Sequence, residues 1–394
     1  MNDCGTEAPR DGVGGGRTVM APLPMFQPDD APCCGPPPAP PSSALEKPGY
    51  SIRPFVAEFL DAPVGPVPRV KTRLDKRDWL GALGARIGGT RSDYKIAPGL
   101  YAAGRPGDES PVLVTSNYKL TFDALRRELD GLNAWLLVLD ARGVNVWCAA
   151  GKGLFGTEEL VRRIALTGLD RVVAHRKLVL PQLGATGVSS RQVKKDSGFE
   201  VVWGPIRARD VKKFLQNGLV ADPGMRLVSF SPLDRAVLVP IEVSHLIKPA
   251  LLLIAGLFLV SGLGVHVFSL GEAWRRGLMA MWGVLGGVLA GAVVAPILLP
   301  WIPGTAFSFK GALAGLVAGL ATAGYFWDGS GWLDKAALVL LAAVLGSYLT
   351  MNFTGSTPFT SPSGVEKEMR RAIPLQVVSG AAALVLWISS GFLS

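Results

Sequence analysis

Five long apolar stretches in the second half of the chain constrain its fold more than any other feature. They run over residues 249–268, 277–300, 311–327, 336–350 and 374–393. Each is close to the length that a helix needs to cross a bilayer, although the fourth is somewhat short. The sequence therefore predicts an all-α membrane domain of five transmembrane helices over residues 249–394, in contact with membrane lipid.

Small and aromatic residues recur in these stretches in patterns typical of membrane helices. Two glycine rows have four-residue spacing: Gly283, Gly287 and Gly291, and then Gly311, Gly315 and Gly319. Such rows let helices pack backbone to backbone. Tryptophans stand at the ends of the stretches, where amphipathic rings prefer the membrane interface: Trp301, Trp327 and Trp332.

The basic residues between the stretches indicate an orientation. Lys310 lies in the second loop, and Lys367, Arg370 and Arg371 lie in the fourth. Because cytoplasmic loops are rich in Lys and Arg, we expect a multi-pass protein of the cytoplasmic (inner) membrane with its N-terminal domain in the cytoplasm. Arg275 and Arg276 depart from this pattern, since we expect them in the first, external loop. No Asp, Glu, Lys or Arg lies deep inside a predicted span, which argues against ion-coupled transport.

The first half of the chain divides into three segments by composition. Residues 1–50 are rich in Pro and Gly and are expected to be a disordered tail without a cleaved signal peptide, and residues 51–95 have mixed character. Residues 96–240 alternate strand signals (111–115, 134–139, 178–180 and 201–203) with helix signals (120–132, 157–166 and 208–216). Buried strands alternating with helices predict an α/β, Rossmann-like domain with a parallel sheet covered on both faces.

Charge and cysteine usage exclude some functions. The net charge is +9, with 40 basic and 31 acidic residues, but no aromatic–basic patch accompanies it, so we expect no nucleic-acid partner. Of the four cysteines, Cys4, Cys33 and Cys34 lie in the tail and only Cys148 lies in the α/β domain. No Cys-x-x-Cys occurs, so the chain is not expected to hold an iron–sulfur cluster of its own.

The segment around Cys148 is the candidate site. It reads Asn145, Val146, Trp147, Cys148, Ala149, Ala150, Gly151 and Lys152. Asn145 is a good N-cap, which makes Val146 to Cys148 the first turn of a short helix, where the backbone dipoles favour a thiolate. The next three residues carry almost no side chain, so a large partner could approach, and Gly151 could end the helix in a left-handed conformation. The alternative is a small buried cysteine in a core helix.

This octapeptide resembles the cap-helix signature of the HgcA family, the membrane-anchored corrinoid proteins of microbial mercury methylation. The resemblance implies a bound cobalamin or related corrinoid, with Cys148 as the lower axial ligand to cobalt. A soft, strongly donating thiolate opposite a methyl group would favour its transfer to a soft acceptor, here mercuric ion. The resemblance also implies a ferredoxin-like electron donor, HgcB, and a methyl-folate-linked methyltransferase as methyl donor.

A second segment, Val114 to Thr121, is similar to the corrinoid iron–sulfur protein large subunit, a likeness that we extend over residues 95–225. It implies that Thr115 and Thr121 lie near the corrin, although both hydroxyls could instead cap the following helix. In residues 182–188, Gly184 and Gly187 could wrap the nucleotide tail of the cofactor, and the turn at Gly204 and Pro205 fits the same rim.

Two alternatives remain beside a mercury-methylating, corrinoid-dependent methyltransferase. The corrinoid could serve another acceptor, or the chain could be a membrane sensor or transporter with a regulatory α/β domain. No Asp-x-His-x-x-Gly pattern supplies a histidine ligand, and His175 is expected to be structural. No Gly-x-Gly-x-x-Gly follows the first strand, which disfavours a dinucleotide.

Overall fold

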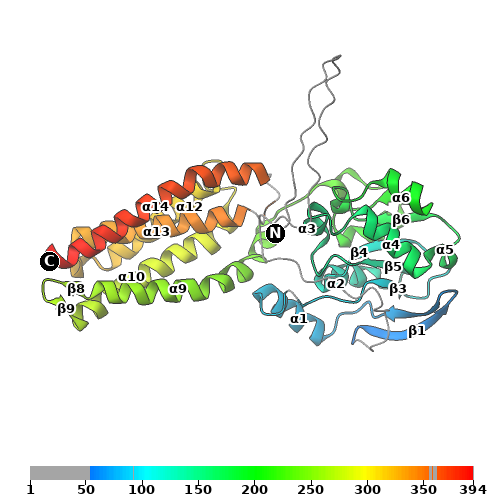
Figure 1. Ribbon diagram of the computed structural model, residues 1–394, viewed down its shortest axis with the longest axis horizontal. Coiled ribbons are helices and arrows are strands. Elements are labelled where there is room, and N and C mark those ends of the chain that lie inside the picture. The colour runs from blue at the N-terminus through cyan, green and yellow to red at the C-terminus, as the bar shows by residue number, and fades with distance from the viewer. Residues whose placement is uncertain (1–53, 92, 355–356, 358–361, 394) are drawn as a thin grey trace, which may run out of the picture.

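A mixed sheet of seven strands organises the first part of the chain, and a bundle of apolar helices forms the second part (Figure 1). This computed structural model describes residues 54–91, 93–354, 357 and 362–393. The predicted tail, with Cys4, Cys33 and Cys34, lies outside the described residues, as does most of residues 355–361. The α/β part lies at one end of the bundle and the C-terminal end of the chain lies at the other (Figure 1).

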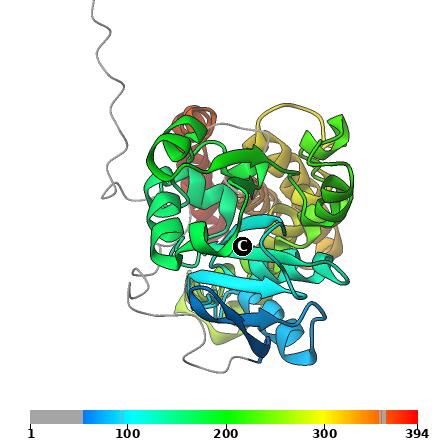
Figure 2. The same ribbon diagram turned by 90° about the vertical axis from the view of Figure 1, so that its right-hand side faces the viewer.

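The sheet has the order β1-β2-β3-β5-β4-β6-β7. Its strands are β1 (Val56–Ala62), β2 (Gly65–Val70), β3 (Gly99–Ala103), β4 (Val112–Ser116), β5 (Ala134–Leu139), β6 (Lys177–Leu180) and β7 (Glu200–Trp203). Strands β5, β4, β6 and β7 are parallel, but β3 is antiparallel to β5, and β1 forms an antiparallel hairpin with β2. The prediction of a parallel sheet is therefore wrong at this edge, where residues 56–103 supply three strands that the sequence patterns did not indicate (Figure 2).

Two hydrophobic cores lie on the two faces of the sheet. Strand β5 shows the division, because Leu137 and Leu139 enter one core and Leu136 and Val138 enter the other. The first core includes side chains of α3 (Val146–Gly151), α4 (Thr157–Thr167), α5 (Leu169–Val172) and α6 (Ser190–Ser197). The second includes side chains of α2 (Lys119–Arg126) and α7 (Val211–Gln216). The predicted covering of the sheet on both faces is confirmed.

Some predicted helix limits need correction. The helices expected over 120–132 and 208–216 are partly 3₁₀, at Arg127–Leu129 and Ala208–Asp210. The N-cap of α4 is Gly156, and Thr157, the first residue of the helix, does not cap it. The Thr157 hydroxyl instead accepts a hydrogen bond from the Ser189 amide at 2.8 Å, which ties α4 to the start of α6.

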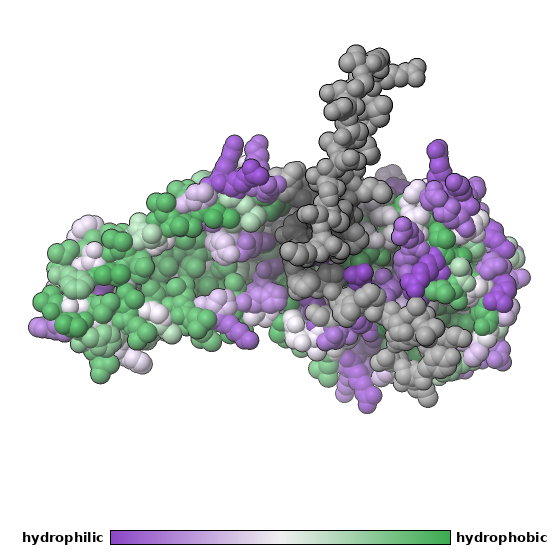
Figure 3. Space-filling view, viewed as in Figure 1, coloured by the Kyte–Doolittle hydropathy of each residue, from purple (hydrophilic) through white to green (hydrophobic). Residues whose placement is uncertain are grey.

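Among the described residues, five continuous helical segments are long and apolar enough to cross a membrane, which agrees with the predicted number of spans. The bundle contains α9 (Val239–Ser261), α10 (Leu270–Leu289), α11 (Ala295–Leu298), α12 (Phe307–Tyr325), α13 (Trp332–Phe353) and α14 (Pro362–Leu393), and α10 and α11 belong to one of the five segments, Leu270–Leu298. The first predicted span ends too late, because Leu263–Gly264 and Val267–Phe268 form the small hairpin β8–β9. Hydrophobic surface covers much of the bundle, whereas the α/β part has a mixed surface (Figure 3).

The glycine rows hold α10 and α12 closely against α13. A Cβ atom added at Gly291 would lie 2.8 Å from Cα of Gly346, and one added at Gly319 would lie 2.7 Å from Cα of Val339. No side chain larger than hydrogen fits these contacts without a backbone shift. The predicted backbone-to-backbone packing is confirmed.

The expected position of Arg275 and Arg276 in a loop is wrong, because both belong to α10. Arg276 is fully buried, forms an ion pair with Asp334 of α13 at 3.1 Å, and donates to the backbone carbonyl of Trp387 in α14. Arg275 pairs with Glu272 at 2.7 Å. The bundle therefore contains a buried ion pair that the predicted span limits had excluded.

Arg235 joins the two parts of the molecule. It belongs to α8 (Pro232–Ala236), just before α9, and is 3% exposed. Its guanidinium donates to the carbonyl oxygens of Phe230 and Ile297, and it lies 5.7 Å from the ring centroid of Trp301. The linker is thus fixed to the end of α11.

Candidate functional site

A cavity of about 400 Å³ opens at the carboxyl ends of the parallel strands. It lies where the strand order reverses, because the chain passes from β4 to β5 on one side and then returns to β6 on the other. Ligands of α/β sheets bind at such points. The walls come from β4, β6, α2, the first turn of α3 and the turn that follows β7. They are mostly apolar, with Thr115, Thr121 and Asn145 among the polar residues.

Helix α3 carries Cys148 beside this cavity. The Asn145 side chain accepts a hydrogen bond from the Cys148 amide at 2.9 Å, so the predicted N-cap is confirmed. Asn145, Val146 and Trp147 line the cavity. Cys148 is a free, exposed cysteine, so a buried core cysteine is excluded. Trp147, beside it, is 43% exposed, which is unusual for so large an apolar side chain.

The small residues of α3 divide between two environments. Ala149 and Ala150 are buried and belong to the core between the helix and the sheet. Gly151 is exposed, and a Cβ atom there would meet nothing within 4 Å, so its backbone is open to a partner. Gly151 does not end the helix as predicted; Lys152 is the C-cap, and the left-handed residue is Gly153, with φ 72°.

Gly184 and Gly187 lie against α3 and the segment after it. A Cβ atom at Gly184 would be 2.7 Å from the Phe155 ring, and one at Gly187 would be 3.0 Å from Cα of Ala150. Their small size therefore lets this loop pack closely on the cysteine helix. The turn at Gly204 and Pro205 lines the cavity on its other side.

Asn117 positions the loop that leads to α3, a role that the sequence patterns did not reveal. Its side-chain oxygen accepts hydrogen bonds from the amides of Ala141 and Gly143, each at 3.0 Å, and its side-chain nitrogen donates to Asp140 at 2.9 Å. Arg142, in the same loop, has φ 52°, in the left-handed region. Asn117 and Asp140 directly follow neighbouring parallel strands, and this position at the strand ends could have identified them from the sequence.

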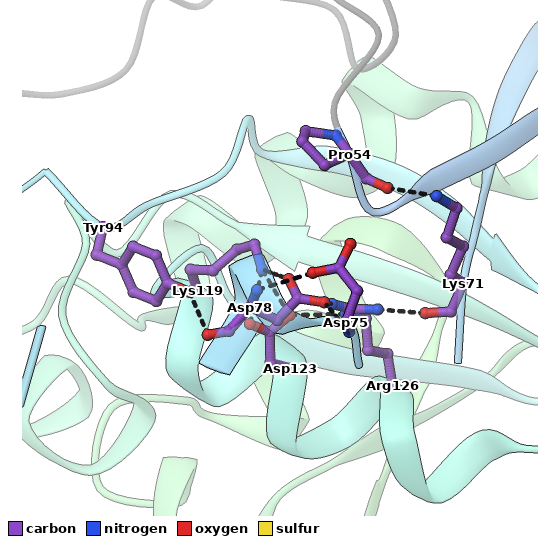
Figure 4. A network of polar contacts seen from close by, with 8 residues as sticks. All are labelled: Pro54, Lys71, Asp75, Asp78, Tyr94, Lys119, Asp123 and Arg126. Atoms are coloured by element: carbon purple, nitrogen blue, oxygen red, sulfur yellow. Dashed lines mark hydrogen bonds and ion pairs between the residues drawn. The ribbon is translucent and has the colours of Figure 1, made fainter. Parts of the chain in front are cut away.

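A buried charge network supports the opposite wall of the cavity (Figure 4). It joins Asp78 of α1 (Lys76–Ile87) to Lys119, Asp123 and Arg126 of α2. Lys119 and Arg126 each pair with both carboxylates at 2.7 Å. Because other residues of α2, including Thr121, line the cavity, the network fixes the position of that wall.

Burial and the charges of this network change the pKa values of Asp78 and Tyr94. Burial raises the pKa of Asp78, but hydrogen bonds from Lys119, the Asp75 backbone and Arg126 outweigh it, and the pKa falls to about 2. Burial, followed by the charges of Asp123 and Asp78, raises the pKa of Tyr94 to about 12. The Asp78 carboxyl is therefore charged, and the Tyr94 phenol neutral, at neutral pH.

His175 has a structural role, as predicted. Its Nδ1 accepts a hydrogen bond from the Lys177 amide at 3.2 Å, so the other ring nitrogen donates to the Ser110 carbonyl at 2.9 Å. Both ring nitrogens are thus engaged by the backbone.

The α/β part of the chain matches a known family. Residues 89–215 match the model of the CdhD family, described as the CO dehydrogenase/acetyl-CoA synthase delta subunit. The matched residues are therefore similar to a domain of the CO dehydrogenase/acetyl-CoA synthase delta subunit.

Individual relatives agree with this result. The chain is 33% identical over 128 residues to the acetyl-CoA decarbonylase/synthase complex subunit gamma of Methanopyrus kandleri, which covers 32% of this chain and 27% of the relative. It is 27% identical over 129 residues to the corrinoid/iron-sulfur protein large subunit of Moorella thermoacetica, covering 32% of this chain and 28% of the relative. The predicted likeness to the latter protein is confirmed. The chain spans little more than a quarter of either relative.

Proposed function

We propose that the chain is a corrinoid-dependent methyltransferase whose Rossmann-like α/β domain, at about residues 96–240, is held at a membrane by five helices. The observation that carries the proposal is the cavity at the carboxyl ends of β4 and β6, with an exposed cysteine on the capped helix at its rim. The match to corrinoid-protein subunits supports the choice of cofactor.

The residues around the cavity fit a corrinoid in their chemistry. A corrinoid is larger than the cavity, so part of it would lie outside, over the exposed face of α3 and the open backbone of Gly151. Thr115, Thr121 and Asn145 line the cavity and offer polar groups to amide side chains of the corrin. Gly184 and Gly187 keep their loop close enough to α3 to follow a nucleotide tail.

The cofactor supplies a cobalt-bound methyl group that can be transferred to an acceptor. Cys148 would hold cobalt through its thiolate, and the Asn145 cap and the Asn117 hydrogen bonds would keep the thiolate in place. Trp147 would cover the rim against water. The octapeptide supports mercuric ion as the acceptor, HgcB as the electron donor and a methyl-folate-linked methyltransferase as the methyl donor.

Purification under anaerobic conditions tests the proposal directly. The full-length chain, reconstituted with a corrinoid, should bind cobalt and show a visible spectrum that changes in Cys148→Ala, and methylmercury formation in cells should fall to background in that variant. Replacing Cys4, Cys33 and Cys34 together with alanine is the matched control and should leave both unchanged. A colourless, cobalt-free protein would favour a sensor or transporter.

The acceptor is a separate question, because the relatives are named for acetyl-CoA chemistry and not for mercury. Purified methylated protein should be offered mercuric ion, other metals, metalloids and thiols in parallel. Transfer to another acceptor at a higher rate than to mercuric ion would retain the corrinoid role and reject the mercury assignment.

A further inference from the structure

Helix α1 presents a large apolar face that nothing in the described chain covers. Trp79, Leu80, Leu83 and Ile87 are 61%, 68%, 52% and 47% exposed. At 3.6 residues per turn, these four positions fall within an arc of about 100°. The opposite side of the helix is packed, with Asp78 and Ala85 buried. A contiguous exposed face of this kind marks an interaction surface.

The location of α1 indicates what covers this face. Its C-cap, Gly88, packs against the first turns of α9, where an added Cβ atom would lie 2.8 Å from Ile241 and 3.2 Å from Ser244. Lys248, one to two turns further along, is the last charged residue of α9 before its apolar run. The end of α1 therefore lies about one turn outside the apolar part of the bundle, beside α9 (Figure 1). At that level a membrane would present its headgroup region.

The charges of α1 complement an anionic surface. Its exposed charged residues are all basic: Lys76, Arg77 and Arg86. On the helical projection, Arg77 and Arg86 fall on the two sides of the apolar arc. Apolar residues with a tryptophan, bordered by basic residues, are typical of helices that lie in the plane of a membrane interface.

We infer that α1 is a membrane-surface helix whose face of Trp79, Leu80, Leu83 and Ile87 inserts among lipid headgroups, favouring anionic lipid. This inference rests on the membrane placement of the five helices proposed above. Since α1 also carries Asp78, which pairs with Arg126 and Lys119 of α2, the lipid surface would contact an element that supports the helix lining the cavity.

Depth measurements on the full-length chain test the inference. Single cysteines are introduced by Leu83→Cys, Leu166→Cys or Leu289→Cys, with the four native cysteines replaced by serine. Leu166, in α4, is 55% exposed and serves as the aqueous control; Leu289, in α10, is 56% exposed and serves as the lipid control. Each variant carries an environment-sensitive fluorophore and is placed in nanodiscs of phosphatidylcholine with phosphatidylglycerol.

Doxyl lipid should quench the label at position 83 several-fold more than the label at 166. Iodide should quench the label at 83 less than the label at 166. Equal iodide quenching at 83 and 166 would overturn the inference. So would protection of 83 from both quenchers, which would mean that a second copy or residues 1–53 cover the face. If the label at 289 escapes lipid quenching, the membrane placement of the bundle itself fails.

Charge reversal tests the lipid preference. Arg77→Glu with Arg86→Glu should reduce lipid quenching at position 83 at least twofold in discs with phosphatidylglycerol, and much less in phosphatidylcholine alone. An equal effect in both membranes would reject the preference for anionic lipid.

Discussion

In the two halves of the molecule, different properties of a side chain decide whether it is buried or exposed. In the α/β part, large apolar side chains such as Phe122, Phe155 and Phe199 are fully buried, and the surface is mixed. In the bundle, large apolar side chains such as Leu251 and Leu252 point outward, and the buried positions of α12 are mostly Gly, Ser and Ala. Polarity therefore separates inside from outside in the first half, whereas along α12 side-chain size does so, a pattern typical of helices that pack in a membrane.

Both halves nevertheless contain buried charged side chains. The largest expected loss of stability comes from removing one cation of the cluster in the α/β part. Arg126→Met would leave Asp78 and Asp123 with Lys119 as their only buried cation. We expect a loss of about 3–5 kcal/mol in the free energy of unfolding of the α/β part, because uncompensated charge would remain buried. Arg127→Met, at a half-exposed neighbour, should change the unfolding midpoint little. Equal effects would show that the network does not stabilise this half.

Arg276→Met makes the corresponding change in the bundle. It leaves Asp334 as a single buried carboxylate without its cation, so we expect a smaller loss of about 1–3 kcal/mol, measured by thermal unfolding in detergent. Adding Asp334→Leu should recover most of the loss, because an apolar pair can replace a buried ion pair. A double variant less stable than the single one would indicate a further role for Asp334.

Glycine substitutions in α12 test whether side-chain size limits how closely the helices pack. Gly315→Ala would bring a Cβ atom to 2.8 Å from Cα of Ala343, so we expect a loss of about 1–3 kcal/mol from overpacking. Gly324→Ala, on the same helix with nothing within 4 Å, is the matched control and should be neutral or stabilising. Indistinguishable melting of the two variants would mean that α12 and α13 are not held as closely as described.

The smallest effect is a pH dependence confined to the α/β part. The pKa of Asp78 is lowered from 3.8 to about 2, so its contribution to stability is present above about pH 4 and is lost as the pH falls toward 2. The unfolding midpoints of the parent and of Asp78→Asn should therefore converge over that range. A constant difference from pH 5 to pH 2 would contradict this assignment.

Local signals predicted much of this architecture. Strand β5 was predicted at its observed limits, 134–139, because it is a continuous apolar run bounded by polar residues. The Asn145 cap and the glycine rows also follow from short spacings. The four parallel strands and their helices therefore required no knowledge of distant contacts.

Features that depend on distant residues were missed. Arg276 was assigned to a loop because its partner, Asp334, lies 58 residues away, and the burial of Ala149 and Ala150 depends on the sheet beneath them. Helix α1 lies within a segment of mixed composition, and its apolar residues remain exposed, so burial could not reveal it. The strands β1 to β3 join the sheet through pairings that local patterns do not specify.

Arg235 has a consequence for encounters with other proteins. Its hydrogen bond to the Ile297 carbonyl and its contact with Trp301 hold the linker on the end of α11, and Gly88 of α1 packs on α9. These contacts limit the orientations of the α/β part relative to the helices, and so the directions from which another protein could reach the cavity. Loosening that joint would change how often productive collisions occur without altering any residue that touches a ligand.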